Sequence, residues 1–368
     1  MVWTRKPIST LAFALLIFST PEATPCTGIM FKAQDGSIIF GRSMEWGATD
    51  LESELIIIPR GREYTGKTGT KLQGLNWTTR YGVVGMNSLD QDVVLDGINE
   101  KGLYSGLFYF PDIAEYPEIV EANAQNTITS WQLSTWILSN FATISEVRKA
   151  LSKITLSSAG FPRFPSGPEG IPLHAIVVDS SGKSIVVEPI GGRLVISDNP
   201  LGILTNAPEF QWQMANIRNY VKLSPFNAKA KTVNGVELKP WGQGSGFVGL
   251  PGDITPPARF IRALYMGHAA LPGKNGEEGL LQAVRVMNAF YITKGYVRES
   301  HKDEVLYEYS QWETFTDLSN RVLMFRTYDN PGQLRKVIVD EFDFDAKEIK
   351  KISIHQKLDV LDVTDHAK

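Results

Sequence analysis

Residues 26–46 read CTGIMFKAQDGSIIFGRSMEW, and they determine the first element of the fold. Two short runs rich in β-forming residues, Thr27–Lys32 and Ser37–Gly41, are separated by a segment that contains Asp35-Gly36. Asp-Gly between two such runs is a strong signal of a β-hairpin turn. The stretch therefore predicts an antiparallel hairpin whose first strand starts directly after Cys26.

The rest of the chain is strand-like at first, helical in the middle and strand-like again towards the end. Further strands are predicted at Leu55–Pro59, Tyr81–Met86, Asp92–Leu95, Leu103–Tyr109, His174–Asp179, Ser184–Glu188, Leu194–Ser197, Gly202–Leu204, Val305–Tyr309, Trp312–Asp317 and Arg321–Thr327. Helices are predicted over Trp131–Phe141, after a capping box of Thr143 and Glu146, over Arg259–Ala270 behind Pro256-Pro257, and over Leu280–Tyr291. No internal repeat or low-complexity linker divides the chain, so we expect one α+β domain over residues 26–368.

The composition is that of a globular protein with balanced charge. The chain has 368 residues, of which 43% are hydrophobic and 21% charged, and its net charge is −3. Such a chain buries a sizeable core, and the lack of a basic excess argues against a nucleic-acid partner. One cysteine excludes an intramolecular disulfide framework and a cysteine-rich zinc site, and five scattered histidines argue against a histidine-built metal site. We therefore expect no metal and no cofactor.

The N-terminus has the three-part order of a secretory signal peptide. Arg5 and Lys6 are positive, Leu11–Phe18 is apolar, and Ser19–Pro25 is polar and rich in small residues. The apolar run is much shorter than the roughly 20 residues of a membrane-spanning helix, and no later apolar run reaches that length. We therefore expect a signal peptide or pro-segment over residues 1–25, no membrane span, and a periplasmic or secreted protein. The alternative is a buried N-terminal helix.

Cys26 follows this segment directly, and three interpretations of it stay open. It is a buried thiol without a function, a lipid-modified anchor, or the nucleophilic first residue of the mature chain. A lipoprotein signal requires a small residue directly before the cysteine and a leucine-like residue three positions before it, where this chain has Pro25 and Ala23. Pro25 is also a poor cleavage site, so the cleavage position stays open, with cleavage after Ala23 and later trimming as one route.

An N-terminal cysteine combines a nucleophile and a base in one residue. The thiolate is the nucleophile, and a free α-amine, whose pKa is about 7.7–8.0, accepts its proton near neutral pH. Such a site also needs a cation, a carboxylate and amide donors. Arg42 and Glu45 follow the second predicted strand, so the hairpin brings a positive and a negative side chain close to Cys26. The motifs G-x-S-x-G and H-E-x-x-H, which mark other chemistries, are absent from the sequence.

Five separated motifs complete the pattern. They are Cys26–Gly28 (CTG), Gly41–Trp46 (GRSMEW), Asp96–Leu103 (DGINEKGL), Asn199–Asn206 (NPLGILTN), and Gly249–Asp253 (GLPGD) followed by Arg259-Phe260. In this order, after a lone cysteine, they resemble the choloylglycine hydrolase family of N-terminal-nucleophile hydrolases, which includes bile salt hydrolases and penicillin V acylases. The resemblance extends from Cys26 to about Asn330, which is most of the expected mature chain.

The resemblance implies the four-layer αββα sandwich of the Ntn-hydrolase fold and hydrolysis of a linear, non-peptide amide. It implies Cys26 as the nucleophile, with its own α-amine as the proton acceptor. Glu45 stands where the family usually has Asp, so whether it holds the α-amine stays open. The remaining implied roles are support of the thiolate by Arg42, an oxyanion donor in the side chain of Asn206 with the backbone of Asn99 as its companion, and electrostatic support by Arg259.

The substrate is less well defined by the resemblance. Conjugated bile salts are the first expectation, with penicillin V and acyl-homoserine lactones as alternatives; all have an apolar acyl half that suits an aromatic-lined cleft. Trp46 and Trp77 are candidate lining residues for that cleft. The family also implies a homo-oligomer, with a homotetramer as the expectation. A non-catalytic exported binding protein or lipoprotein remains the alternative of another class.

Overall fold

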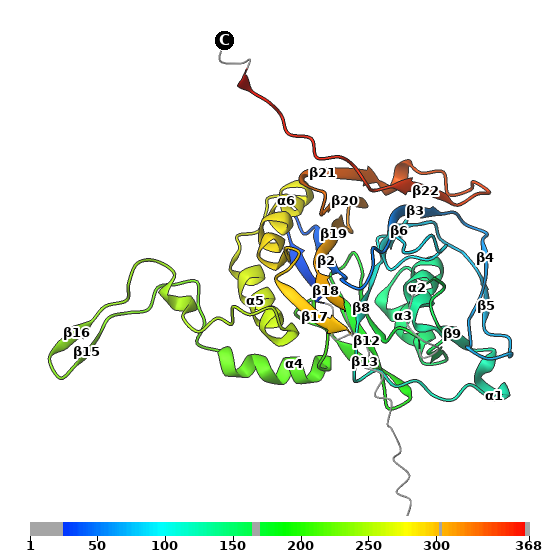
Figure 1. Cartoon of the computed structure of the whole chain (residues 1–368), viewed down its shortest axis with the longest axis horizontal. Helices are drawn as coiled ribbons and strands as arrows, with labels where there is room; N and C mark the ends of the chain where they lie inside the picture. The colour runs from blue at the N-terminus through cyan, green and yellow to red at the C-terminus, as the bar shows by residue number, and fades with distance from the viewer. Residues whose placement is uncertain (1–24, 164–169, 302–303, 365–368) are drawn as a thin grey trace, which may run out of the picture.

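The computed structural model describes residues 25–163, 170–301 and 304–364, in which two large antiparallel sheets pack together. Helices cover the outer side of each sheet, which gives the layers α, β, β and α from left to right in Figure 1. The expected αββα sandwich is thereby confirmed. Of the predicted signal peptide, residues 1–25, all but Pro25 lies outside the described residues.

The first sheet is built on the predicted hairpin, whose register places Gly28 opposite Arg42. Its six strands follow the order β14-β1-β2-β19-β20-β21. In chain order they are β1 (Thr27–Lys32), β2 (Ile38–Glu45), β14 (Ile203–Leu204), β19 (Ser310–Asp317), β20 (Val322–Thr327) and β21 (Asn330–Ile338). Two helices, α5 (Pro256–Ala269) and α6 (Gly276–Met287), pack against β1, β2 and β19.

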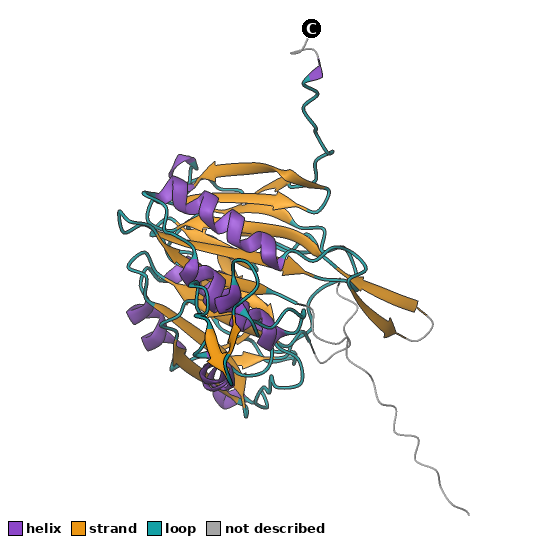
Figure 2. Ribbon diagram, turned by 90° about the vertical axis from the view of Figure 1, so that its left-hand side faces the viewer, coloured by secondary structure: helices purple, strands orange, loops and turns teal. Residues whose placement is uncertain are grey.

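The second sheet has eight strands in the order β13-β12-β11-β8-β7-β6-β3-β22. In chain order they are β3 (Glu54–Ile58), β6 (Val83–Met86), β7 (Asp96–Asn99), β8 (Tyr104–Tyr109), β11 (Leu173–Val178), β12 (Ser184–Ile190), β13 (Arg193–Asp198) and β22 (Lys350–Ser353). Helix α2 (Leu133–Asn140) packs on β7 and β8, with α3 (Ile144–Leu151) beside it in Figure 1. The predicted capping box is confirmed, because Thr143 Oγ1 accepts the N–H of Glu146. A side view of the sheets and helices is given in Figure 2.

The inner faces of the sheets form the core, and they approach most closely at the start of β1. A Cβ atom on Gly28 would lie 2.7 Å from Cζ of Phe40 and 2.9 Å from Cζ of Phe108. Real Cβ atoms do not come this close to other heavy atoms, so glycine is required here. Gly28 is therefore packed against both sheets, which restricts where Cys26, two residues earlier, can lie.

One predicted strand, Asp92–Leu95, is wrong. The strand at this place is β7, which starts at Asp96. Val93 and Val94 are buried, but the N–H of Val94 donates to Oγ1 of Thr135 in α2 and not to a neighbouring strand. The apolar run is buried because it packs under helix α2. A short apolar run in a sequence does not show whether it is buried in a strand or under a helix.

Smaller elements lie around the two sheets. They are the hairpin β4 (Glu63–Thr65) and β5 (Asn76–Thr78), the parallel pair β9 (Thr127–Thr129) and β10 (Thr155–Ser157), the hairpin β17 (Val297–His301) and β18 (Glu304–Glu308), and the helices α1 (Glu121–Ala124) and α4 (Phe210–Asn216). Within the described ranges, no helix combines the length and the apolar character that crossing a membrane would need.

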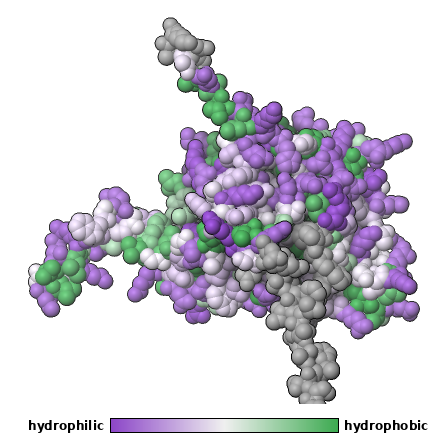
Figure 3. Space-filling model, viewed as in Figure 1, coloured by the Kyte–Doolittle hydropathy of each residue, from purple (hydrophilic) through white to green (hydrophobic). Residues whose placement is uncertain are grey.

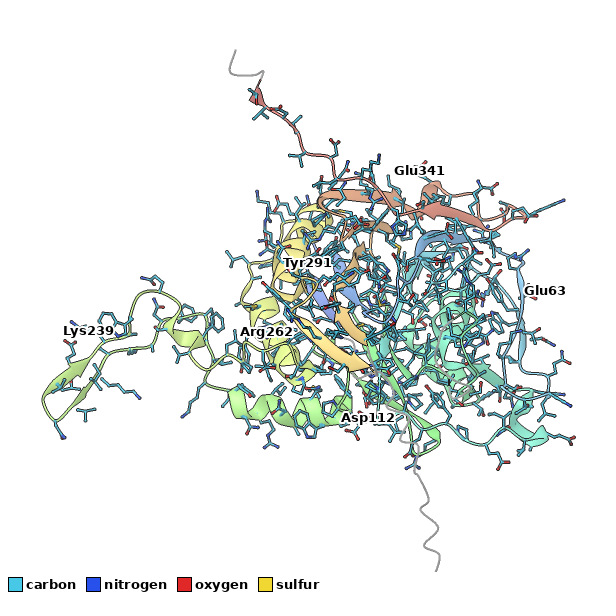
Figure 4. The ribbon with its side chains drawn as sticks, in the orientation of Figure 1. Glu63, Asp112, Lys239, Arg262, Tyr291 and Glu341 are labelled. Carbon is cyan, nitrogen blue, oxygen red and sulfur yellow. The ribbon has the colours of Figure 1, made fainter. Side chains whose placement is uncertain are left out.

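The hairpin of β15 (Lys231–Val233) and β16 (Val236–Leu238) ends an arm that leaves the body of the molecule. Lys239 lies on this arm, well away from Arg262 in α5 (Figure 4). Apolar residues gather at the tip of the arm in Figure 3, where the surface is otherwise largely hydrophilic on the face that is shown. No pattern noted in the sequence predicts this arm.

Candidate active site

A narrow apolar pocket reaches the thiol of Cys26 and has a volume of about 40 Å³. It is formed where the ends of β2, β8 and β11 meet a short helical turn that contains Trp131. The lining residues are Cys26, Arg42, Met44, Trp46, Leu51, Ser88, Leu95, Leu107, Tyr109, Trp131, Phe161, Ile171 and Leu173. Almost all of these side chains are apolar, so the pocket suits an apolar group placed beside a thiol.

Cys26 is 2% exposed and lies among charged groups. Its backbone N–H donates to Oδ1 of Asn206 at 2.7 Å, and Nη2 of Arg42 lies 4.0 Å from its Sγ. Burial raises the pKa of the Cys26 thiol, whereas the positive charges of Arg42 and Arg259 oppose that rise. The two guanidinium groups therefore favour the thiolate in a place where burial disfavours it.

Arg42 is fixed by partners on the second sheet. Nη1 lies 3.3 Å from the carboxylate of Asp96, and Nη2 donates to the carbonyl oxygen of Leu107 at 2.5 Å. The guanidinium carbon also lies 4.7 Å from the ring centroid of Phe108. The carboxylate of Asp96 compensates the buried charge of Arg42, and the contacts with Leu107 and Phe108 orient its guanidinium. Arg42 is therefore a cation with a fixed position beside the thiol.

Glu45 is buried at the end of β2. Ser310 Oγ donates to its Oε1 at 2.6 Å, and Ser43 Oγ donates to its Oε2 at 3.1 Å. Burial raises the pKa of Glu45 to about 8, although the two hydroxyls and the positive charge of Arg259 act in the opposite direction. Near neutral pH this carboxyl is therefore close to the point where it gains or loses its proton.

Asn206 and Arg259 complete the surroundings of Cys26. Asn206 Oδ1 accepts from Nη2 of Arg259 at 2.7 Å as well as from Cys26, and its Nδ2 donates to the carbonyl oxygen of Tyr109 at 2.8 Å. Arg259 Nη1 donates to the carbonyl oxygen of Cys26 and to Oγ1 of Thr27. Burial lowers the pKa of Arg259 to about 10. Of the two hydrogens on Nδ2 of Asn206, one is used by Tyr109 and the second can serve another acceptor.

Asn99 does not have the geometry that the resemblance implies. Its backbone N–H donates to the carbonyl oxygen of Leu103, so it is not available to an oxyanion. Its side-chain Oδ1 accepts the N–H groups of Lys101 and Leu103, and its Nδ2 donates to the carbonyl oxygens of Leu138 and Phe141. Asn99 therefore shapes the turn between β7 and β8 and ties it to the end of α2. The expectation of a backbone oxyanion donor at Asn99 is corrected.

Of the two candidate tryptophans, one lines the pocket and the other does not. Trp46 lines the pocket and packs edge-to-face on Tyr109, with ring centroids 5.3 Å apart. Trp77 does not line the pocket: it stacks on Tyr64 at 5.1 Å, and its Nε1 donates to Oγ of Ser139. The proposed substrate contact of Trp77 is therefore corrected to a packing role.

Tyr109 and Trp131 are the site residues that the sequence analysis missed. Tyr109 is the last residue of β8, where its side chain lines the pocket and its carbonyl oxygen holds Asn206. The sequence predicts the strand, but it does not say which end of that strand meets Cys26. In the parts of the chain that the structure describes, no three or more His, Cys, Asp or Glu side chains come together as a metal site would require.

Comparisons with known proteins show the family to which the chain belongs. The family model described as linear amide C–N hydrolases, choloylglycine hydrolase family, matches residues 26–352. The bile salt hydrolase/transferase of Clostridium perfringens is 31% identical over 340 residues, 91% of this chain and 98% of that protein. The penicillin V acylase of Pectobacterium atrosepticum is 30% identical over 73% of this chain and 67% of that protein. A crystal structure of a variant of the conjugated bile acid hydrolase from Clostridium perfringens has a TM-score of 0.79 and 30% identity, and the match covers 92% of this chain and 100% of that one. The chain therefore belongs to the choloylglycine hydrolase family and is a hydrolase of C–N bonds in linear amides.

Proposed function

We propose that this chain is an exported hydrolase of conjugated bile salts, or of other linear amides with an apolar acyl group, and that Cys26 is its nucleophile. The observation that carries the proposal is the position of the chain's only thiol, which lies in an apolar pocket beside two buried arginines. The name of the Clostridium perfringens relative supports bile salts as the first candidate, and the penicillin V acylase of Pectobacterium atrosepticum supports penicillin V as the second.

In the proposed reaction, removal of residues 1–25 frees the α-amine of Cys26. The amine takes the thiol proton, and the thiolate attacks the amide carbonyl carbon. The second hydrogen on Nδ2 of Asn206 is directed at the oxyanion of the tetrahedral intermediate. When the C–N bond breaks, the α-ammonium gives its proton to the leaving amine. Water, activated by the same α-amine, then hydrolyses the thioester and releases the acid.

The test of this proposal is release of the amine by the purified mature protein. Glycocholate, taurocholate, penicillin V and a long-chain acyl-homoserine lactone are offered side by side at equal concentration. Release of glycine or taurine supports bile salt hydrolysis, and release only from penicillin V or from the lactone reassigns the acyl specificity. No release from any of them, with a free Cys26 at the N-terminus, would contradict the proposed substrates.

Export and processing are tested by the mass of the mature N-terminus. We propose a periplasmic or secreted location, supported by the three-part order of residues 1–25. Mass spectrometry of the protein from a native-like host should find Cys26 as a free first residue. A diacylglycerol adduct on Cys26 would instead support a lipoprotein, and a retained Thr24-Pro25 would block the proposed base.

We propose that Glu45 also hydrogen-bonds the freed α-amine. On that basis Glu45→Gln should lower kcat roughly tenfold, because a charge-assisted hydrogen bond contributes about 1.5 kcal/mol or more. The sign of the pH effect follows from the charge. The freed α-ammonium favours the ionised form of Glu45, whose pKa burial raises to about 8, and the carboxylate in turn raises the pKa of the α-amine. Without that carboxylate the amine loses its proton at lower pH, so the acidic limb of kcat/KM should move to lower pH.

The control for this prediction is Glu45→Asp, which keeps the charge and shortens the side chain by one methylene. It should retain the acidic limb of the parent even if its rate is reduced. A pH profile of Glu45→Gln that overlies that of the parent would show that Glu45 does not act on the α-amine.

We also propose that the protein forms a homo-oligomer, with a homotetramer as the expected size. The arm of β15 and β16 supports this, because it carries large apolar side chains in solvent: Phe226, Trp241 and Val248 are 80%, 97% and 81% exposed. Such exposure away from a core is typical of an interaction surface.

Replacement of residues 229–241 by a short Gly-Ser turn should therefore lower the mass measured by sedimentation towards that of one chain. The replacement keeps Asn227, whose side chain holds the base of the arm through the N–H of Gly244. A variant with Ser at both Val233 and Val236 is a milder version that leaves the backbone intact. An unchanged mass for both variants would contradict a role of the arm in assembly.

A further inference from the structure

Trp131 stands between two cavities. One face of its indole lines the narrow pocket that reaches Cys26. The same residue also lines a second cavity of about 440 Å³, which is formed by the loop of residues 65–74 together with Ala159, Gly160 and Pro162. Among the described residues, Trp131 is the one that lines both, so its side chain lies between the two spaces and forms part of the wall that separates them.

The wall is a side chain on a fixed backbone. Trp131 is 3% exposed, its Nε1 donates to the carbonyl oxygen of Ala159 at 2.9 Å, and its ring packs edge-to-face on Phe161 at 5.1 Å. On either side, Ser130 Oγ donates to the carbonyl oxygen of Ile171, and Gln132 Oε1 accepts the N–H of Lys67. Because the neighbours anchor the backbone, a smaller residue at position 131 would open the wall without moving the turn.

The two cavities differ in size and chemistry. The pocket beside Cys26 is apolar and has about 40 Å³, which holds only a small part of a bile acid or a fatty acyl chain. The cavity behind Trp131 is about ten times larger and is lined in part by polar groups, including Thr68, Thr70 and Gln73. A long acyl group that entered from Cys26 would therefore pass an apolar section first and end in a space that accepts a polar or hydrated tip.

We propose that Trp131 sets the upper limit of acyl length, and that the cavity behind it is an extension subsite for the far end of longer acyl groups. This rests on the proposed function, because it takes Cys26 as the point where the acyl carbonyl is attacked. In the parent protein the indole stops the chain at Trp131. When the indole is removed, further methylenes can contact Phe161 and then reach the larger, partly polar space beyond it.

The experiment compares the parent with Trp131→Ala on straight-chain N-acyl amides of one amine, from four to fourteen carbons, by amine release. In the parent, kcat/KM should rise with length and then stop rising. In Trp131→Ala it should continue to rise beyond that length, by up to about threefold to fourfold for each added methylene that becomes buried. The shortest substrates should change by less than about threefold, since they do not reach the indole.

Two further variants make the result specific. Trp136→Ala removes the same side chain from α2, where it is 5% exposed and lines neither cavity, so it controls for loss of stability. Ala159→Leu in the Trp131→Ala background places a larger side chain in the second cavity and should restore the parent limit. Trp131→Phe takes the place of Trp131→Ala in the experiment if the alanine variant does not fold. It should move the limit in the same direction by a smaller step.

The same length limit in Trp131→Ala and the parent, or an equal shift in Trp136→Ala, would overturn the proposal. If the parent releases no amine from any acyl amide, the proposed function fails, and binding then tests Trp131 separately. Calorimetry measures the binding of free fatty acids to Cys26→Ala and to the double variant Cys26→Ala, Trp131→Ala. The affinity should continue to grow with the length of the fatty acid only in the double variant. Equal length dependence with and without Trp131 would contradict the subsite even then.

Discussion

Cys26→Ala is expected to show no amide hydrolysis above background, while the protein keeps its fold. The variant lacks the only thiol of the chain, and no other nucleophile is proposed in the pocket. Cys26 is buried, and the loss of one sulfur atom should lower the free energy of unfolding by only about 1–2 kcal/mol. Amine release measures the first effect, and chemical denaturation measures the second.

A Cys26→Ala protein that kept residues 1–25 would also lack the free α-amine, so its inactivity would have two explanations. Alkylation of Cys26 in the mature parent protein therefore provides an independent control. A single cysteine means that iodoacetamide can add only one thiol adduct, and the mass of the whole protein reports its extent. Activity should fall in proportion to the fraction of alkylated Cys26, and saturating substrate should slow the reaction. Full activity in fully alkylated protein, or turnover by Cys26→Ala, would eliminate Cys26 as the nucleophile.

Asn206→Ala is expected to lower kcat by roughly 10²–10³, the typical effect of removing one oxyanion donor. The side chain has a second task, because its Oδ1 accepts from the backbone N–H of Cys26 and from Nη2 of Arg259. The alanine variant removes both functions at once. Its loss of activity alone therefore does not say which function of Asn206 is needed.

Asn206→Asp separates the two tasks of that side chain. Aspartate keeps an oxygen acceptor for Cys26 and Arg259, and it lacks the Nδ2 donor. If the donor stabilises the oxyanion, Asn206→Asp should lose at least as much kcat as the alanine variant. Its second oxygen faces the carbonyl oxygen of Tyr109, so a loss of stability is expected as well. Near-parental kcat in Asn206→Asp would show that the residue only positions the nucleophile.

The sequence predicts the part of the site that depends on short-range order. Asp35-Gly36 fixes the turn, and the turn fixes the register that places Arg42 opposite Gly28 and next to Cys26. Because the spacing along one hairpin is set by the chain itself, no long-range information is needed. The same reasoning explains why the capping box at Thr143 is correct.

The parts that could not be predicted depend on which groups meet across the fold. Asn99 and Tyr109 lie at opposite ends of the hairpin formed by β7 and β8, and the sequence does not say which end faces Cys26. Whether a backbone N–H is free depends on its partner, and for Asn99 the partner is Leu103. Trp46 and Trp77 are equally apolar in sequence, and only packing separates the pocket wall from the stacked pair with Tyr64.

The narrowness of the pocket also bears on the chemical lifetime of the thiol. Hydrogen peroxide is small enough to enter a space of about 40 Å³, so narrowness alone does not keep this oxidant from the thiol. Burial raises the pKa of Cys26, which lowers the thiolate fraction and so slows its reaction with peroxide. The chain has no second cysteine that could capture a sulfenic acid as an internal disulfide. Resistance to oxidation therefore depends on slow formation of the sulfenic acid, since repair within the molecule is not available.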